Sequence, residues 1–599
     1  MKTWKWLGML TPVVALLGCG GGGDSVPVRI QTLSGPVVGV HDTASSTVHY
    51  LGIPFAKAPV GDLRWKAPVA PDAWTTPLAA DTFGQACLQH GRIYGPGSNN
   101  TYDDTVATTL NQPVGAEDCL TLNIWRPDSN AANLPVIVFF YGGSNISGYS
   151  ADPSYDGANL ARKANAVVVS ANYRVGLMGW LRLAQLQEGT SELDDSGNFG
   201  TLDTVAALQF VQDNIARFGG DKDNVTIWGH SAGAVNVFAL MASPQAAGLF
   251  HKAVPMSGGA TSVKSAQAAL PSMQSTVVHE GYAMRLLHAL VIDHSGDASV
   301  TDAASAAAYV AGKTKEEIAT FLRGLTGAQI ITSAMTPRAP AVGLTANGAA
   351  VATPASPPIP EGKVIPVDVI QAFKDNDFNN VPVMVGNTRD EGKLFGTLPP
   401  VVFGGASFNS LYAMNDHDRF MAMKNFDPNT PTDDLTPHIR AEFLPITTAP
   451  GTVSFAGDYN DWTQIYGRAI FTDVMSPRTK GVAAEALDAL KSVQPQTYYF
   501  QFDWDREPAP WNVVYGAAHG FELPFFFANF DKASLFSNTA GGTSNEQGRL
   551  ALSDAMLNSL AAFARTGNPN HTGLGVTWGA WPQVIRFDAS DTTTEITME

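Results

Sequence analysis

Cysteine and basic residues are scarce in this chain of 599 residues. It has only three cysteines, which excludes a small fold held together by many disulfides. Lysine and arginine number 37 against 54 acidic residues, so the formal net charge is −17, and no long basic run occurs. We therefore expect no nucleic-acid partner. Only 15% of the residues are charged and 45% are hydrophobic, a composition that excludes a disordered protein and predicts a large buried core.

The N-terminus carries a targeting signal. Two early lysines precede an apolar run at residues 7–17, which is too short to span a bilayer, and no later segment resembles a membrane helix. The run ends in Leu16-Leu-Gly-Cys19, which resembles a bacterial lipobox. We expect residues 1–18 to be a signal peptide, Cys19 to be lipidated and residues 19–27 to form a flexible tether. The protein would then be exported from a bacterial cytoplasm and anchored by lipid at the outer membrane or cell envelope.

The alternative is ordinary secretory cleavage that removes Cys19 and yields a periplasmic or secreted protein. In either case only Cys87 and Cys119 remain. Two remaining cysteines in an oxidising compartment most simply pair with each other, although two buried thiols are the other possibility.

Apolar strand-like runs alternate with helix-like segments through most of the chain. Five of these runs are short and continuous, as in parallel strands buried on both faces, and lie at 134–141, 166–172, 225–229, 381–386 and 497–502. The segments 201–218 and 549–565 have the apolar spacing of amphipathic helices. The alternation predicts a doubly wound, mostly parallel α/β sheet, and residues 26–50 predict an antiparallel edge at its N-terminal side.

The alternation loosens between about residues 260 and 362. This segment contains alanine-rich helical stretches and then a segment rich in proline, alanine and glycine. We expect a helical insertion over one edge of the sheet, above the active site, with residues 345–360 as a solvated linker.

A nucleophile motif follows one of the strand-like runs. Gly229-His-Ser231-Ala-Gly233 has the pattern Gly-x-Ser-x-Gly, with an apolar strand before it and a helix-compatible run after it. A strained strand-to-helix turn needs small residues around the serine and presents its hydroxyl beside a helix N-terminus. The pattern is frequent by chance in a chain with 57 glycines, so the strand and helix around it are what predict Ser231 as a nucleophile.

A serine hydroxyl needs a base, and the expected chain order is serine, acid, histidine. His519 lies in a loop of small residues after the last strand-like run. Asp390 and Glu391 directly follow the strand-like run before it, so either can orient the histidine. His230 adjoins the nucleophile in a sharp turn and is badly placed to accept its proton.

At these residues the chain resembles the type-B carboxylesterases, the family that contains the cholinesterases and several fungal lipases. The resemblance runs from about Val28 to Asp588 and is interrupted mainly at 260–362. It rests on separate blocks, among them Leu51-Gly-Ile-Pro-Phe-Ala-Lys-Ala-Pro-Val-Gly61, Glu117-Asp-Cys-Leu-Thr-Leu-Asn-Ile-Trp125, Tyr155-Asp-Gly157, Asn172-Tyr-Arg-Val-Gly176, Asp390-Glu-Gly392 and Gly516-Ala-Ala-His-Gly-Phe-Glu522.

The resemblance implies an α/β-hydrolase fold with a single catalytic domain over residues 28–599. It implies a triad of Ser231, His519 and Glu391, because the family's acid directly precedes the glycine at 392. It also joins Cys87 to Cys119. Ser257 matches a hydroxyl that supports the acid, and a plain structural serine is the alternative there. No metal and no organic cofactor are implied.

The glycine-rich loop at residues 141–145 corresponds to the family's oxyanion loop. The resemblance implies that the backbone N–H groups of Gly143, Ser144 and Ala232 meet the developing negative oxygen. Three positions depart from the family pattern: Ser144 replaces a glycine, Asn145 a bulky apolar residue and His230 a glutamate. We expect a more polar pocket. No tryptophan lies between the two paired cysteines, which disfavours choline esters.

We therefore expect a serine carboxylesterase that hydrolyses a small-molecule ester through an acyl-enzyme intermediate. The alternatives are a catalytically silent hydrolase-fold binding protein, and a lipase or an aryl-ester specialist of the feruloyl-esterase or tannase kind. Residues 375–379 begin like a calcium loop but lack its glycine and closing glutamate, so a polar turn is expected. The sequence specifies neither the ester nor an oligomeric state.

Overall fold

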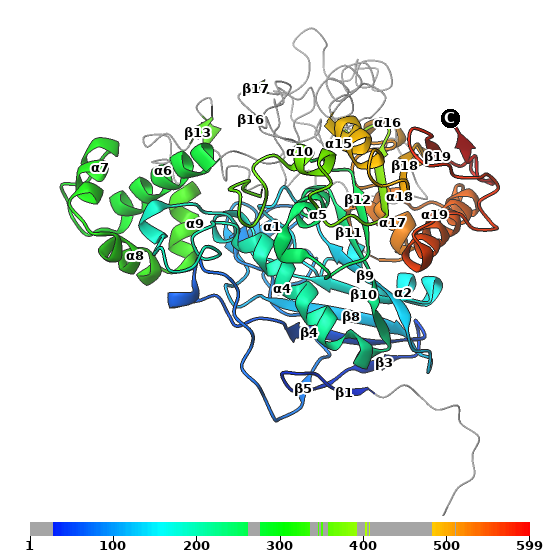
Figure 1. Cartoon of the computed structure of the whole chain (residues 1–599), viewed down its shortest axis with the longest axis horizontal. Helices are drawn as coiled ribbons and strands as arrows, with labels where there is room; N and C mark the ends of the chain where they lie inside the picture. Colours follow the sequence, from blue (N-terminus) through cyan, green and yellow to red (C-terminus); the bar gives the residue numbers. More distant parts are fainter. Residues whose placement is uncertain are drawn as a thin grey trace, which may run out of the picture.

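An eleven-stranded sheet forms the centre of the computed structural model (Figure 1). The structure describes residues 28–260, 276–335, 358–391, 482–508, 511–532 and 534–599, with short pieces between 345 and 407. Its strand order is β20-β19-β18-β15-β12-β11-β9-β10-β8-β4-β3. The parallel strands are β9 (Leu134–Phe140), β10 (Val167–Ala171), β11 (Gly220–His230), β12 (Lys252–Met256), β15 (Val383–Thr388), β18 (Thr497–Phe502) and β19 (Ile585–Phe587).

Antiparallel strands flank this parallel centre. At one edge lie β8 (Thr121–Pro127), β4 (Thr47–Pro54) and β3 (Val40–Asp42), and at the other β20 (Thr597–Met598). The predicted N-terminal edge is divided, since β1 (Arg29–Gln31) pairs with β2 (Pro36–Val38), and β2 pairs with β5 (Leu78–Ala79), in a small sheet of their own. The chain turns between the two sheets at Gly39, where a Cβ would lie 2.4 Å from the carbonyl oxygen of His49.

Helices cover both faces of the sheet. α2 (Ala158–Ala164) connects β9 to β10, and α4 (Phe199–Asn214) connects β10 to β11. Because β9 lies between β10 and β11, the two crossovers run in opposite directions, and right-handed connections place α2 and α4 on opposite faces. α19 (Glu546–Thr566) packs beside α2, whereas α5 (Ala232–Ala242), α10 (Val369–Lys374) and α15 (Val482–Lys491) continue the layer of α4 (Figure 1). This arrangement confirms the predicted doubly wound α/β sheet.

The reversal of strand order around β9 determines where a ligand can bind. Connections leave the carboxyl ends of β9 and β11 toward different faces, and in open α/β sheets such a point opens a crevice at that edge. The loops after β9, β11 and β15 all begin at this edge, because these strands are parallel. The predicted nucleophile and acid, and the predicted oxyanion loop, therefore start from one edge of the sheet.

A cluster of four helices lies beyond one end of the sheet, shown in green in Figure 1. It consists of α6 (Thr276–His294), α7 (Ala303–Ala311), α8 (Lys315–Gly324) and α9 (Gly327–Met335), which lie within the segment predicted as an insertion. Its apolar side chains form a hydrophobic cluster of their own with Trp65 and Leu177. Arg64 anchors α8, because its Nη1 donates to the carbonyl oxygens of Leu322 at 3.0 Å and Leu325 at 2.6 Å.

Two of the sequence predictions concern residues that the structure does not describe. Residues 1–27, with the predicted signal peptide and Cys19, lie outside the described residues, as does most of the predicted linker at 345–360. Within the described ranges, no helix has both the length and the apolar character that crossing a bilayer requires.

Candidate active site

Ser231 lies in a sharp turn between β11 and α5. Its backbone has φ 58° and ψ −121°, a conformation that costs a non-glycine residue about 1–3 kcal/mol. Close packing of the backbone enforces the turn: a Cβ on Gly229 would lie 2.2 Å from the carbonyl oxygen of Gly233, and one on Gly233 would lie 2.0 Å from that of Phe140. The Ser231 N–H donates to the carbonyl oxygen of Met256 at 2.8 Å, which ties the turn to β12.

Glu391 and His519 come into direct contact although they are 128 residues apart in sequence. Oε2 of Glu391 meets Nδ1 of His519, and its Oε1 accepts the backbone N–H of Thr388 at 2.9 Å. Both side chains are buried. The backbone joins the two loops as well, because the N–H of Asp390 donates to the carbonyl oxygen of Ala517 at 2.9 Å.

The neighbouring carboxylate of Asp390 has a different partner. Its Oδ2 accepts from Nη2 of Arg389 at 2.8 Å, and the same guanidinium nitrogen contacts Asp505 at 2.9 Å. Arg389 therefore holds Asp390 in a separate ion-pair cluster. Of the two acids that the sequence left open on its own, the structure brings Glu391 to His519.

The contact changes the pKa of both partners. Burial alone would raise the pKa of the Glu391 carboxyl, but the charge and hydrogen bond of His519 outweigh it and hold that pKa below its usual value. Burial alone would lower the pKa of His519, but the charge and hydrogen bond of Glu391, with a further contribution from the charge of Glu522, raise it. The pair therefore favours an ionised carboxylate beside an imidazole of increased basicity.

The loop after β9 passes directly against Ser231. A Cβ on Gly142 would lie 2.8 Å from Cβ of Ser231 and 3.4 Å from its Oγ. Gly143 has φ 106°, and Ser144 adopts φ 58°, so this serine takes the left-handed conformation that a glycine would adopt easily. In the described part of the chain, no backbone or side-chain acceptor takes the N–H groups of Gly143, Ser144 or Ala232. Three donors are thus left for a ligand.

The side chain of Asn145 is bound within the protein. It is 2% exposed, and its amide exchanges two hydrogen bonds with that of Asn236 on α5, with Nδ2 to Oδ1 distances of 3.2 Å and 3.0 Å. The hydroxyl of Tyr173 contacts Oδ1 of Asn145 at 3.4 Å. The departure at Asn145 therefore attaches the loop to α5, the helix that follows Ser231. Asn236 was missed by the sequence analysis, although it is the one polar side chain in α5.

Ser257 and His230 meet at a carboxylate that the sequence analysis did not single out. Oγ of Ser257 donates to Oε1 of Glu522 at 2.6 Å, and the same hydroxyl contributes to lowering the pKa of Glu391. Nε2 of His230 lies 3.1 Å from Oε1 of Glu522, and the rings of His230 and His519 have centroids 4.7 Å apart. The sequence signal for Glu522 was its place at the end of the block that contains His519.

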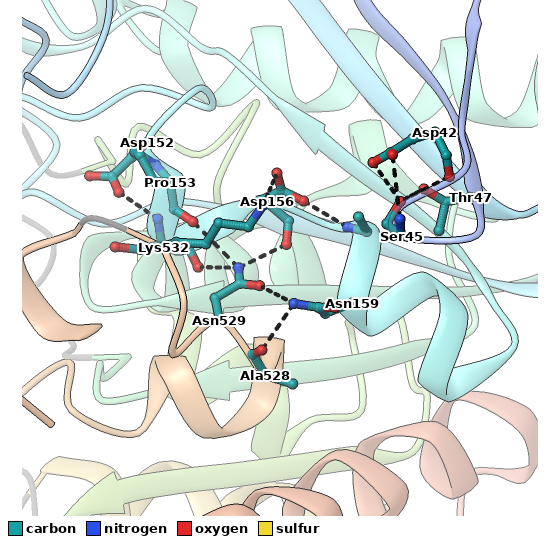
Figure 2. Close-up of polar contacts among 12 residues, drawn as sticks. Asp42, Ser45, Thr47, Asp152, Pro153, Asp156, Asn159, Ala528, Asn529 and Lys532 are labelled. Carbon is teal, nitrogen blue, oxygen red and sulfur yellow. Dashed lines mark hydrogen bonds and ion pairs between the residues drawn. The ribbon is translucent and has the colours of Figure 1, made fainter. Parts of the chain in front are cut away.

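A polar network anchors the segment that follows His519 (Figure 2). Nδ2 of Asn529 donates to the carbonyl oxygen of Asp156 at 2.9 Å, while Nδ2 of Asn159 donates to Oδ1 of Asn529 at 3.2 Å (Figure 2). Lys532 pairs with the Asp156 carboxylate at 3.3 Å. Asn529 lies just after α17 (Leu523–Phe527), so these bonds attach the histidine side of the site to the segment that begins α2.

The predicted disulfide is confirmed, since Cys87 and Cys119 are bonded across a sequence separation of 32. Among the residues that the structure describes, no group of three or more His, Cys, Asp or Glu side chains could hold a metal ion.

Fold and sequence together define the class of protein: the chain belongs to the carboxylesterase family, whose family model matches residues 24–598. It is a carboxylic ester hydrolase with the α/β-hydrolase fold. The family and the fold that the sequence predicted are both confirmed.

Similar proteins and solved structures agree with this family and this fold. The chain is 29% identical over 551 residues to the para-nitrobenzyl esterase of Bacillus subtilis (strain 168), covering 91% of this chain and 92% of that protein. It is 30% identical over 577 residues to the human cocaine esterase, covering 94% and 88%. A thermophilic PNB esterase structure superposes with a TM-score of 0.67 at 26% identity, covering 96% of this chain and 98% of that one.

Proposed function

We propose that this carboxylesterase uses Ser231 as nucleophile, His519 as general base and Glu391 as the acid that orients the histidine. The observation that carries the proposal is the buried contact between Glu391 and Nδ1 of His519, which turns Nε2 of the ring away from the acid. The strained turn at Ser231 supports it, because such backbone conformations cluster at functional sites.

In the proposed mechanism, His519 removes the hydroxyl proton as Ser231 attacks the ester carbonyl carbon. The carbonyl oxygen becomes negative and accepts hydrogen bonds from the backbone N–H groups of Gly143, Ser144 and Ala232. The tetrahedral intermediate collapses as the imidazolium gives its proton to the departing alcohol. Water, deprotonated by the same histidine, then attacks the acyl-enzyme and releases the carboxylic acid.

The proposed substrate is a neutral small-molecule carboxylic ester. The relative named para-nitrobenzyl esterase supports aryl-containing esters as the first compounds to test. The net charge of −17 disfavours anionic esters that reach the site by diffusion.

The test is a Ser231→Ala variant assayed with a p-nitrophenyl acyl ester and labelled with a fluorophosphonate probe. We expect turnover near background and loss of labelling, with an unchanged thermal unfolding profile. The matched control is Ser299→Ala in the exposed turn between α6 and α7, which should keep both activity and labelling. Undiminished turnover by Ser231→Ala would refute the assignment, and a wild type that neither turns over esters nor labels would instead indicate a silent binding protein.

We further propose that Cys19 is lipidated after removal of residues 1–18 and that one catalytic domain spans residues 28–599, with an insertion at about 260–362. The lipobox-like residues before Cys19 support the anchor. Expression in a bacterium fed with labelled palmitate should label the wild type and not Cys19→Ala, and the variant should leave the membrane fraction. If the wild type and Cys19→Ala were found in the membrane fraction in equal amounts, the proposed lipid anchor would be refuted.

A further inference from the structure

Beside the Glu391–His519 contact lies a second contact of the same chemistry. Nε2 of His230 and Oε1 of Glu522 are 3.1 Å apart, and the ring of His230 lies 4.7 Å from that of His519, centroid to centroid. His230 is 3% exposed and Glu522 is 1% exposed. Two imidazoles and two carboxylates therefore share one buried space.

Only one of the two carboxylate oxygens of Glu522 has a hydrogen-bond partner among the described residues. Ser257 donates to its Oε1, whereas its Oε2 has no hydrogen-bond partner among the described residues. In the same set of residues Nε2 of His230 has no hydrogen-bond partner of good geometry either, although it lies 3.1 Å from Oε1 of Glu522. A buried carboxylate is costly unless a cation lies beside it, and here the adjacent imidazoles can supply that cation.

We propose that His230 and Glu522 form a second, ionised pair that sets the lower pH limit of ester hydrolysis. The inference rests on the proposed function, because it takes His519 as the base. An anionic Glu522 stabilises the imidazolium form of His519 and so keeps the base protonated. A cation on His230 offsets that anion and leaves His519 free to act at lower pH. His230 is thus a positioning residue that acts through its neighbours.

The other groups around the pair are consistent with this arrangement. Burial lowers the pKa of His519, and the charges of Glu391 and Glu522 raise it. The phenol of Tyr155 also feels the charge of Glu522, but burial raises its pKa well above the usual value, so it stays neutral and adds no charge. The hydroxyl of Ser257 is uncharged. The balance at His519 therefore depends on Glu391, Glu522 and His230.

The experiment measures kcat/KM against pH for the full-length protein and for His230→Gln, Glu522→Gln and the double variant. The acidic limb of this profile reports the pKa of the base in the free enzyme. His230→Gln should move the limb to higher pH by about one unit, and Glu522→Gln should move it to lower pH by about one unit. The double variant should lie between them. A purely structural role would lower activity without opposite shifts.

The matched control is His41→Gln, because His41 on β3 also contacts a carboxylate, Oδ2 of Asp128 at 3.3 Å, outside the site. Its acidic limb should stay in place. If Glu522→Gln fails to fold, the test is His230→Asn, which must move the acidic limb to higher pH as His230→Gln does. Limbs that stay in place or move in the same direction would overturn the inference while leaving the triad intact, whereas an active Ser231→Ala variant would remove the triad itself.

Discussion

Replacement of Asn236 by leucine tests whether the amide pair between α5 and Asn145 holds the proposed oxyanion loop. Leucine has nearly the shape of asparagine but cannot exchange the two hydrogen bonds with Asn145. Because Asn145 is 2% exposed and Asn236 fully buried, the remaining amide would be stranded away from water. A stranded buried polar group costs about 1–3 kcal/mol of the free energy of unfolding.

The same substitution should reduce turnover. Asn145 directly follows Ser144, and Asn236 lies on the helix whose first residue is Ala232, so one amide pair connects both sources of the proposed oxyanion donors. The loop keeps a second attachment, since the N–H of Gly176 donates to the carbonyl oxygen of Asn145 at 2.6 Å. We therefore expect a loss smaller than the roughly 2.7–4 kcal/mol of a deleted donor, at about tenfold in kcat.

The assay combines urea unfolding with kcat and KM for a p-nitrophenyl ester. KM should change little, because the donors act on the negative oxygen of the transition state. A double-mutant cycle with Asn145→Gly isolates the pair, since glycine accepts the φ of 58° found there. Gln209→Leu, which removes an exposed amide on α4, is the matched control and should change stability by less than about 0.5 kcal/mol. A coupling energy below about 0.5 kcal/mol, or an unchanged kcat, would refute the reasoning.

Two further predictions concern the sharp turn at Ser231 and the disulfide. Gly233→Ala should destabilise the protein by more than about 2 kcal/mol and abolish activity, because the new Cβ would lie 2.0 Å from the carbonyl oxygen of Phe140. The control is Gly324→Ala, whose Cβ would enter open space, so this variant should behave like the wild type in thermal melts. Replacement of Cys87 and Cys119 by alanine should lower the free energy of unfolding by about 3–4 kcal/mol in the chain-entropy model for a loop of this length. An unchanged apparent Tm would contradict the disulfide prediction.

Strands with continuous apolar sequence were predictable. Residues 497–502 are β18 as predicted, and the run at 134–141 is β9 to within one residue. β12 was not singled out, because its five residues, Lys252–Met256, include a lysine and Pro255. A proline in a central parallel strand contradicts local propensity, and the neighbouring strands β11 and β15 override it.

In the candidate site, too, some residues could be identified from the local sequence and others could not. Ser231 could be singled out from the local sequence, because the sharp turn around it needs its glycines in a fixed pattern between a strand and a helix. The choice between Asp390 and Glu391 had no local answer beyond the family resemblance, since it depends on which carboxylate Arg389 binds. The roles of Glu522 and Asn236 could not be assigned at all, because their partners lie on other elements.

By itself, the amino-acid sequence determined the class of fold, the family, the nucleophile motif and the pair of cysteines that bond. These features follow from short-range patterns of apolar, small and reactive residues. Only the tertiary structure decided which carboxylate meets His519 and which amide pairs with Asn145 in the loop after β9. Such contacts join residues far apart in the chain, by 91 positions for Asn145 and Asn236 and by 128 for Glu391 and His519. Their geometry depends on strand order and packing, which no local pattern encodes.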